Sequence, residues 1–376
     1  MNTYTHQKLK LPLSLNEVEL PEELPPIVLL AFTRPDLLEQ VLLALAKQTL
    51  KPKKILAFID GARNEKDKKL IKKSINLLQE FSNTIPVDII SRPHNLGCDV
   101  NAVTALTQVF THFPAAIYLE DDVVPNPYFY DRMCRLLVAY RDFPQVFSVT
   151  GYANFPQGLN QVIKEDFMVS QRVFALGLGT WADRWHDLNL ANYKQGYNPF
   201  GNYYKIPATI QTKYTIVNQF FLENNHQQDW VITLTLACLY KKYVHITPMV
   251  SFVHNIGCGH PEAKTYNKGG EPRWINLHSD RTANPNKLPP SLKVVDKLAD
   301  SLEGVALAKH LQNCSSIWLS PSATWYLIRK YPGWQSKVAF LRLFFARMLN
   351  YLRHLRATKF AGILNYLRYW RATKKA

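Results

Sequence analysis

Short apolar runs alternate with segments of helical spacing through the first 150 residues. The run Ile27–Phe32 follows a proline-rich stretch and indicates a buried strand, and apolar residues recur at helical spacing from residue 35 to 48. The same alternation predicts further strands over 54–59, 87–91, 115–119 and 146–150, and helices over 66–81, 99–113 and 127–141. Strands that alternate with helices predict an α/β fold, in which a mostly parallel sheet carries helices on both faces.

The pattern becomes less regular and more aromatic from Gly151 to about His278. We expect helices over 180–188 and 229–241 there, and extended segments over 244–246 and 250–253. We interpret residues 21–280 as one α/β domain with two halves, 21–150 and 151–280. An extension over 1–20 precedes this domain, and a connecting region over 281–335 and a tail over 336–376 follow it.

The positive charge of the chain is concentrated in its tail. The formal net charge is +16, but residues 304–376 hold 13 lysines and arginines and no acid, so the rest is near neutral. The tail repeats Leu349–Lys359, with two changes, as Leu364–Lys374. Apolar residues recur in it at helical spacing beside arginines, which indicates a basic amphipathic helix.

Three functions fit such a tail: a nucleic-acid patch, a solvated helical extension and an anchor on an anionic membrane surface. A phosphate-binding arm needs bases but little apolar area, whereas an interfacial helix needs both. We therefore expect membrane attachment and no nucleic-acid partner. Packing of residues 338–356 back on the α/β domain remains an alternative.

Cysteine usage and hydropathy bear on the compartment. The five cysteines form no C-x-x-C pair, which is typical of neither a disulfide framework nor a zinc knuckle and favours a reducing compartment. Residues 1–20 lack the apolar core of a signal peptide, and no stretch of about 18 apolar residues runs uninterrupted. We expect a cytoplasmic protein, peripheral on the inner face of the cell membrane.

Charged residues cluster just after the predicted strands, where ligands collect in open α/β sheets. The three consecutive carboxylates Glu120, Asp121 and Asp122 follow the strand over 115–119. Their mutual repulsion calls for a counterion, and hard oxygen ligands suit Mg²⁺ or Mn²⁺. An acidic turn before the helix that begins near Pro127 is the alternative.

Five segments along the chain resemble GT-A glycosyltransferases of family 2 and of the N-acetylglucosaminyltransferase I type. Residues 117–130 (IYLEDDVVPNPYFY) resemble the aspartate-rich motif with its following proline and aromatic pair, and residues 26–35 (PIVLLAFTRP) resemble the first nucleotide-binding strand. Residues 174–185 (FALGLGTWADRW) are similar to a glycine-rich loop that leads into a tryptophan-bearing helix. Asp229-Trp230 and residues 252–257 (FVHNIG) resemble the catalytic-base and closing segments.

This resemblance implies a transferase that moves a sugar from a nucleotide diphosphate sugar to an acceptor hydroxyl with inversion. Asp122 would bind the metal, Asp121 the ribose or a metal-bound water, and Glu120 the nucleoside side. Asp229 would be the general base, because direct displacement needs one carboxylate to deprotonate the acceptor. A helix N-cap is the alternative role of Asp229.

Further candidates for donor and metal binding follow from the same strand ends and from the resemblance. Asp60 would contact the base or ribose, or else form a turn with Gly61. Of the two histidines in the closing segment, His254 rather than His260 would be a third metal ligand, and the alternative for either is a structural or surface role. The remaining candidates would face the donor: Thr33, Arg34, Arg63, Arg92, Gly177 and Gly179. As alternatives, the arginines fit solvated surface positions and the glycines fit a tight turn.

Two other functions stay open. A sugar nucleotidyltransferase would share the nucleotide-binding sheet and the metal carboxylates but attack at phosphorus. The third possibility is a carbohydrate-binding protein with a degenerate site. Against it stands the presence of Asp60, Asp122 and Asp229 in the same chain. The acceptor would be a glycan, a lipid-linked or a protein-linked group, and the transferred sugar a hexose or an N-acetylhexosamine.

Overall fold

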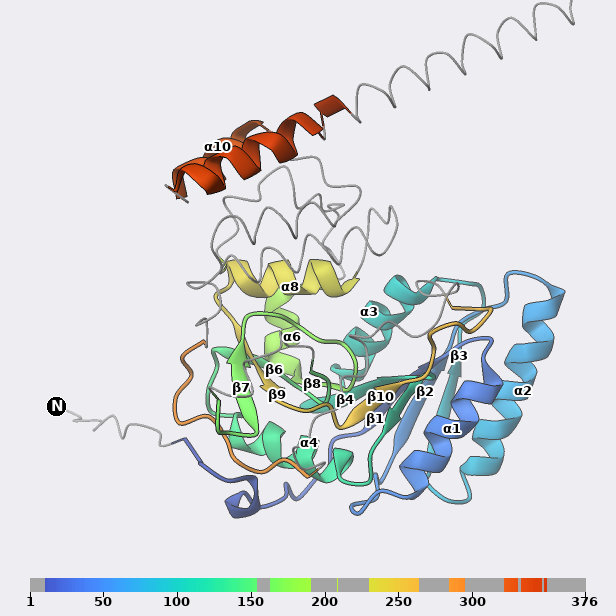
Figure 1. Cartoon of the computed structure of the whole chain (residues 1–376). Helices are drawn as coiled ribbons and strands as arrows, with labels where there is room; N and C mark the ends of the chain where they lie inside the picture. The colour runs from blue at the N-terminus through green and yellow to red at the C-terminus, as the bar shows by residue number, and fades with distance from the viewer. Residues whose placement is uncertain are drawn as a thin grey trace, which may run out of the picture. The chain divides into compact units, whose positions relative to one another are not determined.

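The computed structural model describes residues 11–153, 163–190, 208, 230–263, 284–294, 321–330, 333–346 and 348–349. The chain divides into two compact units, one of residues 1–197 and 226–295 and the other of residues 198–225 and 296–376. The domain boundaries expected from the sequence stay predictions. The first unit carries the sheet, and its helices and strands are labelled in Figure 1.

An eight-stranded sheet in the order β3-β2-β1-β4-β8-β6-β9-β7 forms the centre of the first unit. Its pairings give all strands except β7 and β8 the same direction, so the predicted α/β fold with a mostly parallel sheet is confirmed. Its strands are β1 (Ile27–Ala31), β2 (Ile55–Ile59), β3 (Val87–Ser91), β4 (Ala115–Glu120), β6 (Val146–Thr150), β7 (Phe167–Ser170), β8 (Leu178–Trp181) and β9 (Val244–Pro248).

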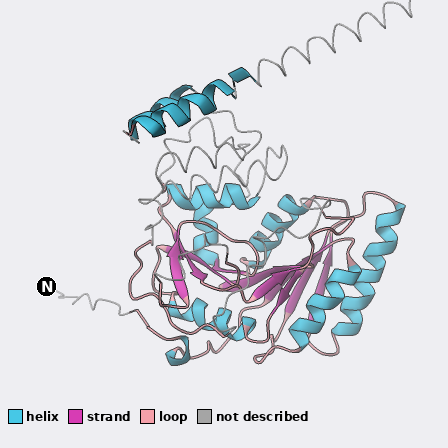
Figure 2. Cartoon of the chain, in the orientation of Figure 1, coloured by secondary structure: helices cyan, strands magenta, loops and turns pink. Residues whose placement is uncertain are grey.

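Helices cover both faces of this sheet (Figures 1 and 2). One face packs against α1 (Pro35–Ala46), α2 (Glu65–Phe81) and α4 (Phe129–Ala139), and the other against α3 (Cys98–Val109), α6 (Ala182–Leu188) and α8 (Trp230–Tyr240). A 3-10 turn, Leu15–Glu17, lies beside α4. The two-sided cover explains why the residues of β1 and β2 are all buried and read as continuous apolar runs.

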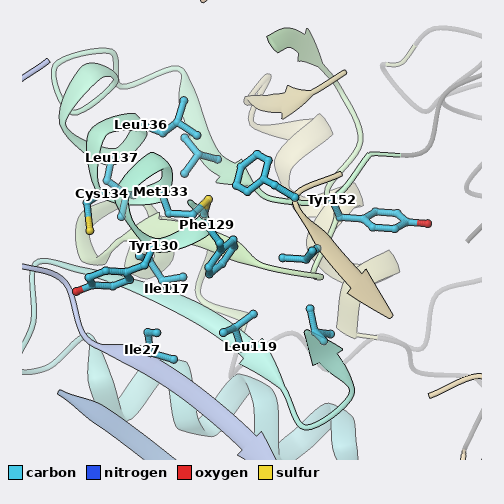
Figure 3. Close-up of a cluster of buried hydrophobic side chains, with 14 of the residues drawn as sticks. Ile27, Ile117, Leu119, Phe129, Tyr130, Met133, Cys134, Leu136, Leu137 and Tyr152 are labelled. Carbon is cyan, nitrogen blue, oxygen red and sulfur yellow. The ribbon is translucent and has the colours of Figure 1, made fainter. Parts of the chain in front are cut away.

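The larger core lies between the sheet and the α1, α2 and α4 face. Figure 3 shows part of it, where Phe129, Met133 and Leu137 of α4 lie against Ile117 and Leu119 of β4. The strand and helix predictions for residues 27–150 match the observed elements to within a few residues. The sequence pattern therefore located this half of the sheet.

The second half of the sheet differs from expectation. The helix predicted over 180–188 begins at Ala182, because residues 178–181 form β8 between β4 and β6. The short strands β5 (Val123–Pro125) and β7 were not predicted, and the extended segment expected over 250–253 pairs instead as β10 (Val253–Asn255). β10 and β5 form a separate antiparallel ribbon at the end of β4.

The second unit contains α10 (Pro321–Lys330) and a helical segment over 334–346. This segment has two apolar faces. Phe340 and Leu343 are buried, whereas three apolar residues of the segment, at spacings of seven and four, are exposed: Trp334 (72%), Leu341 and Phe345 (51%). The repeated part of the tail, residues 351–376, lies outside the described residues. Within the described chain, no helix combines the length and apolar character of a membrane span.

A buried histidine makes the stability of the sheet depend on pH. His245 of β9 is fully buried, its Nδ1 lies 2.8 Å from Ser148 Oγ of β6, and its Nε2 has no hydrogen-bond partner among the described residues. Burial lowers the pKa of His245 to about 3. The folded chain thus keeps this imidazole neutral at pH values where the unfolded chain protonates it.

We expect the free energy of unfolding to fall as the pH drops from about 6.5 towards 3, because the unfolded state binds the extra proton in that window. His245→Asn should flatten this dependence by up to about 1.4 kcal/mol per pH unit, measured by urea unfolding between pH 7 and 5. Ser148→Ala, which keeps the histidine, should retain the slope. An unchanged slope in His245→Asn would assign the dependence to other groups.

Candidate functional site

The acidic triplet lies where β4 ends, in the last strand of the parallel group β3-β2-β1-β4. Glu120 is the last residue of β4 and pairs with Leu30 of β1, while Asp121 and Asp122 form the turn into β5. The side chains of both aspartates are almost completely buried. Because β1 lies between β2 and β4, residues that follow these three strands meet at one edge of the sheet.

Arg34 is the counter-charge of this triplet. It is the residue before α1, and its Nη1 donates to Asp122 Oδ2 at 2.7 Å while its Nη2 donates to Asp121 Oδ1. The backbone N–H of Phe32 donates to Asp121 Oδ2 at 3.3 Å. Burial alone would lower the pKa of Arg34, but Asp121 and Asp122 raise it above its ordinary value. Arg34 is therefore charged at every physiological pH and neutralises one of the two aspartates.

Glu120 lies in a different environment from its two neighbours. Its Oε1 accepts a hydrogen bond of 3.0 Å from the hydroxyl of Tyr118, two residues earlier on the same strand. Burial, and then the nearby charge of Asp122, raise the pKa of Glu120 to about 7. Glu120 thus carries less than a full negative charge near neutral pH, which reduces the repulsion within the triplet.

The ribbon of β10 and β5 covers Asp122. Asn255 pairs with Val123, and the N–H of Ile256 donates to the carbonyl of Asp122 at 2.9 Å. A Cβ atom on Gly257 would lie 2.1 Å from Asp122 Oδ2, so this backbone approaches the carboxylate more closely than any side chain allows. The segment that resembled the closing segment of the transferase family is therefore in direct contact with the acidic triplet.

The environment of Asp122 fits a divalent cation. Its Oδ1 is buried and has no hydrogen-bond partner among the described residues, which leaves one carboxylate oxygen available to a ligand. No group of three His, Cys, Asp or Glu side chains suited to a metal occurs in the described part of the chain. Mg²⁺ and Mn²⁺ sites commonly use one or two protein carboxylates, with phosphates and waters completing the shell. Asp122 fits this kind of site.

The two candidate histidines lie on the same covering segment. His254 is exposed and pairs with Val124 in the ribbon, and a metal-binding role for it stays a prediction. The Nε2 of His260 lies 3.3 Å from Asp36 Oδ2 at the start of α1. Glu262 accepts hydrogen bonds from Lys66 (2.7 Å) and Arg63 (3.3 Å) near the start of α2. Residues 253–262 thus cross the edge of the sheet from β4 to α2.

Asp60 follows β2 and organises the neighbouring loop. Its Oδ1 accepts from the N–H groups of Gly61 and Leu96, both at 2.8 Å, and its Oδ2 accepts from the N–H of Gly97 at 2.9 Å and from Asn95 Nδ2 at 3.0 Å. The expected turn with Gly61 is not formed, because residues 60–62 are irregular and only the Gly61 N–H contacts the Asp60 side chain locally. A contact between Asp60 and a nucleoside stays a prediction, and its four donors show that the carboxylate already fixes the loop over 94–97.

The other two candidate arginines are engaged with nearby helices. Arg63 pairs with Asp67 through its Nε at 2.7 Å and stacks over Phe32 at 4.9 Å. Arg92 donates to Asn101 at 3.0 Å on α3, and burial lowers its pKa. Neither arginine forms a salt bridge with the triplet. Arg34 alone of the three candidate arginines neutralises it.

Thr33 and the two candidate glycines are buried near the triplet strand. Thr33 is almost fully buried between β1 and Arg34. Gly177 has φ +69°, and a Cβ there would lie 2.8 Å from Phe129, while a Cβ on Gly179 would lie 2.9 Å from Met133. Close packing of β8 on α4 therefore accounts for both glycines, and donor contacts at Thr33, Gly177 and Gly179 stay predictions.

Asp229, the candidate base, lies outside the described residues. The next residue, Trp230, begins α8 and packs edge-on against Tyr118 with ring centroids 5.3 Å apart. Tyr118 in turn donates to Glu120. The described start of α8 is therefore linked through one side chain to the acidic triplet.

Sequence reasoning did not identify the contacts made by Tyr118, Asn95 and Glu262. Tyr118 reads as one more apolar position of a buried strand, and Asn95 and Glu262 lie in irregular segments without periodicity. The register of β4 was the available signal for Tyr118, because residues two apart on a strand point to the same face and Glu120 follows at that spacing. No pattern in the sequence pairs Glu262 with Arg63, almost 200 positions away.

Comparison with known proteins gives distant structural likenesses. No protein-family model matches the sequence, and no curated protein matches it. The chain is similar to S. aureus TarS 1–349 in complex with UDP-GlcNAc (11% identity, TM-score 0.36), covering 61% of this chain and 58% of that one. It is also similar to the Pyrobaculum calidifontis mannosyltransferase PcManGT with GDP-Man and Mn²⁺ (12%, 0.40), covering 94% and 84%.

A third similar structure is the Mycobacterium tuberculosis glucosyl-3-phosphoglycerate synthase with Mn²⁺ and UDP. It is 12% identical, with a TM-score of 0.28, and the match covers 43% of this chain and 58% of that one. The match to the S. aureus TarS crystal structure covers 36% of that longer chain. The chain thus spans less than two thirds of the TarS structures.

We expect Gly257→Ala to disrupt the covering of Asp122, because the added methyl group would overlap the Asp122 carboxylate. Amide hydrogen exchange of Ile256, whose N–H donates to Asp122 in the native chain, should accelerate by about tenfold or more, the result of about 1.4 kcal/mol of local destabilisation. Gly333→Ala is the control, since a Cβ there meets only Ser336 Oγ, at 3.7 Å. Unchanged protection at Ile256 in Gly257→Ala would contradict the close approach.

Proposed function

We propose that this chain is a metal-dependent glycosyltransferase that moves a sugar from a nucleotide diphosphate sugar to an acceptor hydroxyl, with inversion. The observation that carries the proposal is Asp122, a buried carboxylate at the end of the central strand with one unpartnered oxygen. The metal bound there would act as a Lewis acid on the leaving diphosphate. The motif resemblance over residues 26–260 supports this reading of the site.

The described residues suggest a division of work. Asp122 would hold the cation, and Arg34 beside it adds a fixed positive charge near the diphosphate. Asp60 holds the loop over 94–97 at the neighbouring strand end, where the nucleoside would bind. Residues 253–257 cover Asp122 and would exclude water from the reacting centre.

The general base in this proposal is Asp229. Its support is the family-like Asp-Trp pair and the packing of Trp230 on Tyr118, which ties the beginning of α8 to the strand that carries the triplet. An inverting reaction needs one carboxylate to take the acceptor proton as the new bond forms. The acceptor would be a glycan, lipid-linked or protein-linked hydroxyl in the synthesis of a glycan, surface polysaccharide or glycolipid.

Attachment to an anionic membrane surface is part of the proposal. The helical segment over 334–346 buries one apolar face and exposes the opposite one, and Lys337 and Arg342 are exposed beside it. A helix in the bilayer interface buries such a face while its bases attract anionic lipid. Phe340 and Leu343 occupy the buried face of this segment, which leaves Leu341 and Phe345 on the exposed one.

We expect Asp122→Ala to lose Mn²⁺-dependent binding of the donor, because it removes the carboxylate with the open oxygen. A thermal-shift screen of nucleotide sugars with and without Mn²⁺ identifies the donor, and calorimetry on the variant should then show a Kd at least about tenfold weaker, or about 1.4 kcal/mol. Arg135→Gln, which affects an ion pair on α4, is the matched control. Unchanged nucleotide and Mn²⁺ affinity in Asp122→Ala would refute the metal assignment.

The product separates the reaction classes. Release of a nucleoside diphosphate from a nucleotide sugar fits a glycosyltransferase, whereas release of pyrophosphate from a nucleoside triphosphate would establish a nucleotidyltransferase instead. Donor binding without turnover for any acceptor class would favour a carbohydrate-binding protein.

Asp229→Asn should leave donor affinity nearly intact and lower kcat by about 10²-fold or more, the usual effect of losing a positioned general base. The amide can still cap a helix, so the substitution separates the two possible roles of this residue. Near-normal kcat in the variant would leave Asp229 with a capping role alone.

Replacing Leu341 and Phe345 by Asp should release the protein from anionic liposomes in a flotation assay, because it places charge on the exposed apolar face. Leu43→Asp, at a similarly exposed position on α1, should still float with the liposomes. Continued flotation of the double variant would rule out this face as the anchor. Binding to neutral as well as anionic liposomes would exclude a role for the bases.

A further inference from the structure

Arg34 and a metal ion would compete for the same carboxylate. Of the two oxygens of Asp122, Oδ2 accepts from Arg34 Nη1 at 2.7 Å and Oδ1 has no partner in the described chain. Arg34 also binds Asp121, so its guanidinium bridges the two aspartates. Its own side chain is 16% exposed, which places this positive charge within the site rather than in solvent.

The charges of Arg34 and the two aspartates determine what can bind at this site. Asp121, Asp122 and Arg34 together leave one net negative charge. A divalent cation on Asp122 Oδ1 therefore meets two carboxylates whose negative charge is already half neutralised. It also meets the positive charge of Arg34 beside it. A nucleoside diphosphate brings additional negative charge, which compensates both cations at once.

We infer that Arg34 is a built-in counter-ion that makes metal binding depend on the nucleotide. In the chain without ligands it occupies the carboxylate pair and keeps the affinity for free Mn²⁺ low. A bound diphosphate would draw Arg34 away from Asp122, and Asp122 would then be free to hold the metal. Binding of metal and nucleotide is then positively coupled, and by linkage each raises the affinity for the other by the same factor.

This inference rests on the proposed function for its nucleotide half, whereas the competition between Arg34 and the metal is a property of the protein alone. The first measurement therefore uses Mn²⁺ without nucleotide, by calorimetry and by electron paramagnetic resonance of free Mn²⁺. Arg34→Gln should bind Mn²⁺ about tenfold or more tighter than the native chain, within the usual range of coupling between sites. Arg135→Gln, which disrupts the ion pair with Asp131 on α4, should bind it as the native chain does.

Two further results complete the test. Arg34→Gln should have a lower Tm without ligand, because it leaves two buried carboxylates uncompensated, and Mn²⁺ alone should raise that Tm more than it raises the native one. Arg34→Lys, which keeps the charge but cannot bridge both carboxylates, should have an intermediate Mn²⁺ affinity. If Arg34→Gln does not fold, the inference is tested with Arg34→Lys, which should also bind Mn²⁺ more tightly than the native chain.

The nucleotide arm uses UDP and GDP as probes. In the native chain, the nucleotide that binds should tighten Mn²⁺ binding by about tenfold or more, and in Arg34→Gln this tightening should shrink. Native Mn²⁺ affinity in both Arg34 variants would overturn the inference. Failure of every nucleotide to bind would refute the proposed function instead, because the experiments with Mn²⁺ alone would still report on Arg34.

Discussion

Placing several carboxylates at the end of a buried strand is the constraint around which the first unit is built. Asp121 and Asp122 are almost entirely removed from solvent, and two neighbouring buried charges of the same sign are unstable unless other groups compensate them. The chain supplies Arg34 from the adjacent strand end and the N–H of Phe32. Glu120, the third carboxyl, accepts a proton more readily than an exposed glutamate does. The parallel order β2-β1-β4 makes this compensation possible.

Hydrogen bonds and ion pairs of acidic side chains also hold the loops around the triplet. Asp60 fixes the loop after β3 through backbone N–H groups, and Glu262 joins the covering segment to α2 through Lys66 and Arg63. These contacts replace the hydrogen bonds that an irregular backbone lacks. Most charged side chains at this edge of the sheet therefore bind one another. Asp122 Oδ1, by contrast, has no hydrogen-bond partner among the described residues.

The sequence predicted the parallel half of the sheet well because its strands are buried on both faces and its helices are amphipathic. It located Arg34, Asp60 and the triplet at strand ends, since chain order alone places those residues there. It did not predict that Arg34, rather than Arg63 or Arg92, neutralises the triplet, because this depends on side-chain reach across two strands. The strands β5, β7 and β8 were missed because each has at most four residues, too few to show a period.

The ribbon of β5 and β10 has a consequence for how the chain acquires its site. Val123 and its partner Asn255 are more than 130 positions apart, so the cover of Asp122 is a highly non-local contact. During synthesis, β1, β2 and β4 with their helices emerge from the ribosome long before residues 253–257 do. A nascent or truncated chain that ends before β10 would present its acidic turn uncovered. Completion of the site is thereby tied to completion of the unit that carries it.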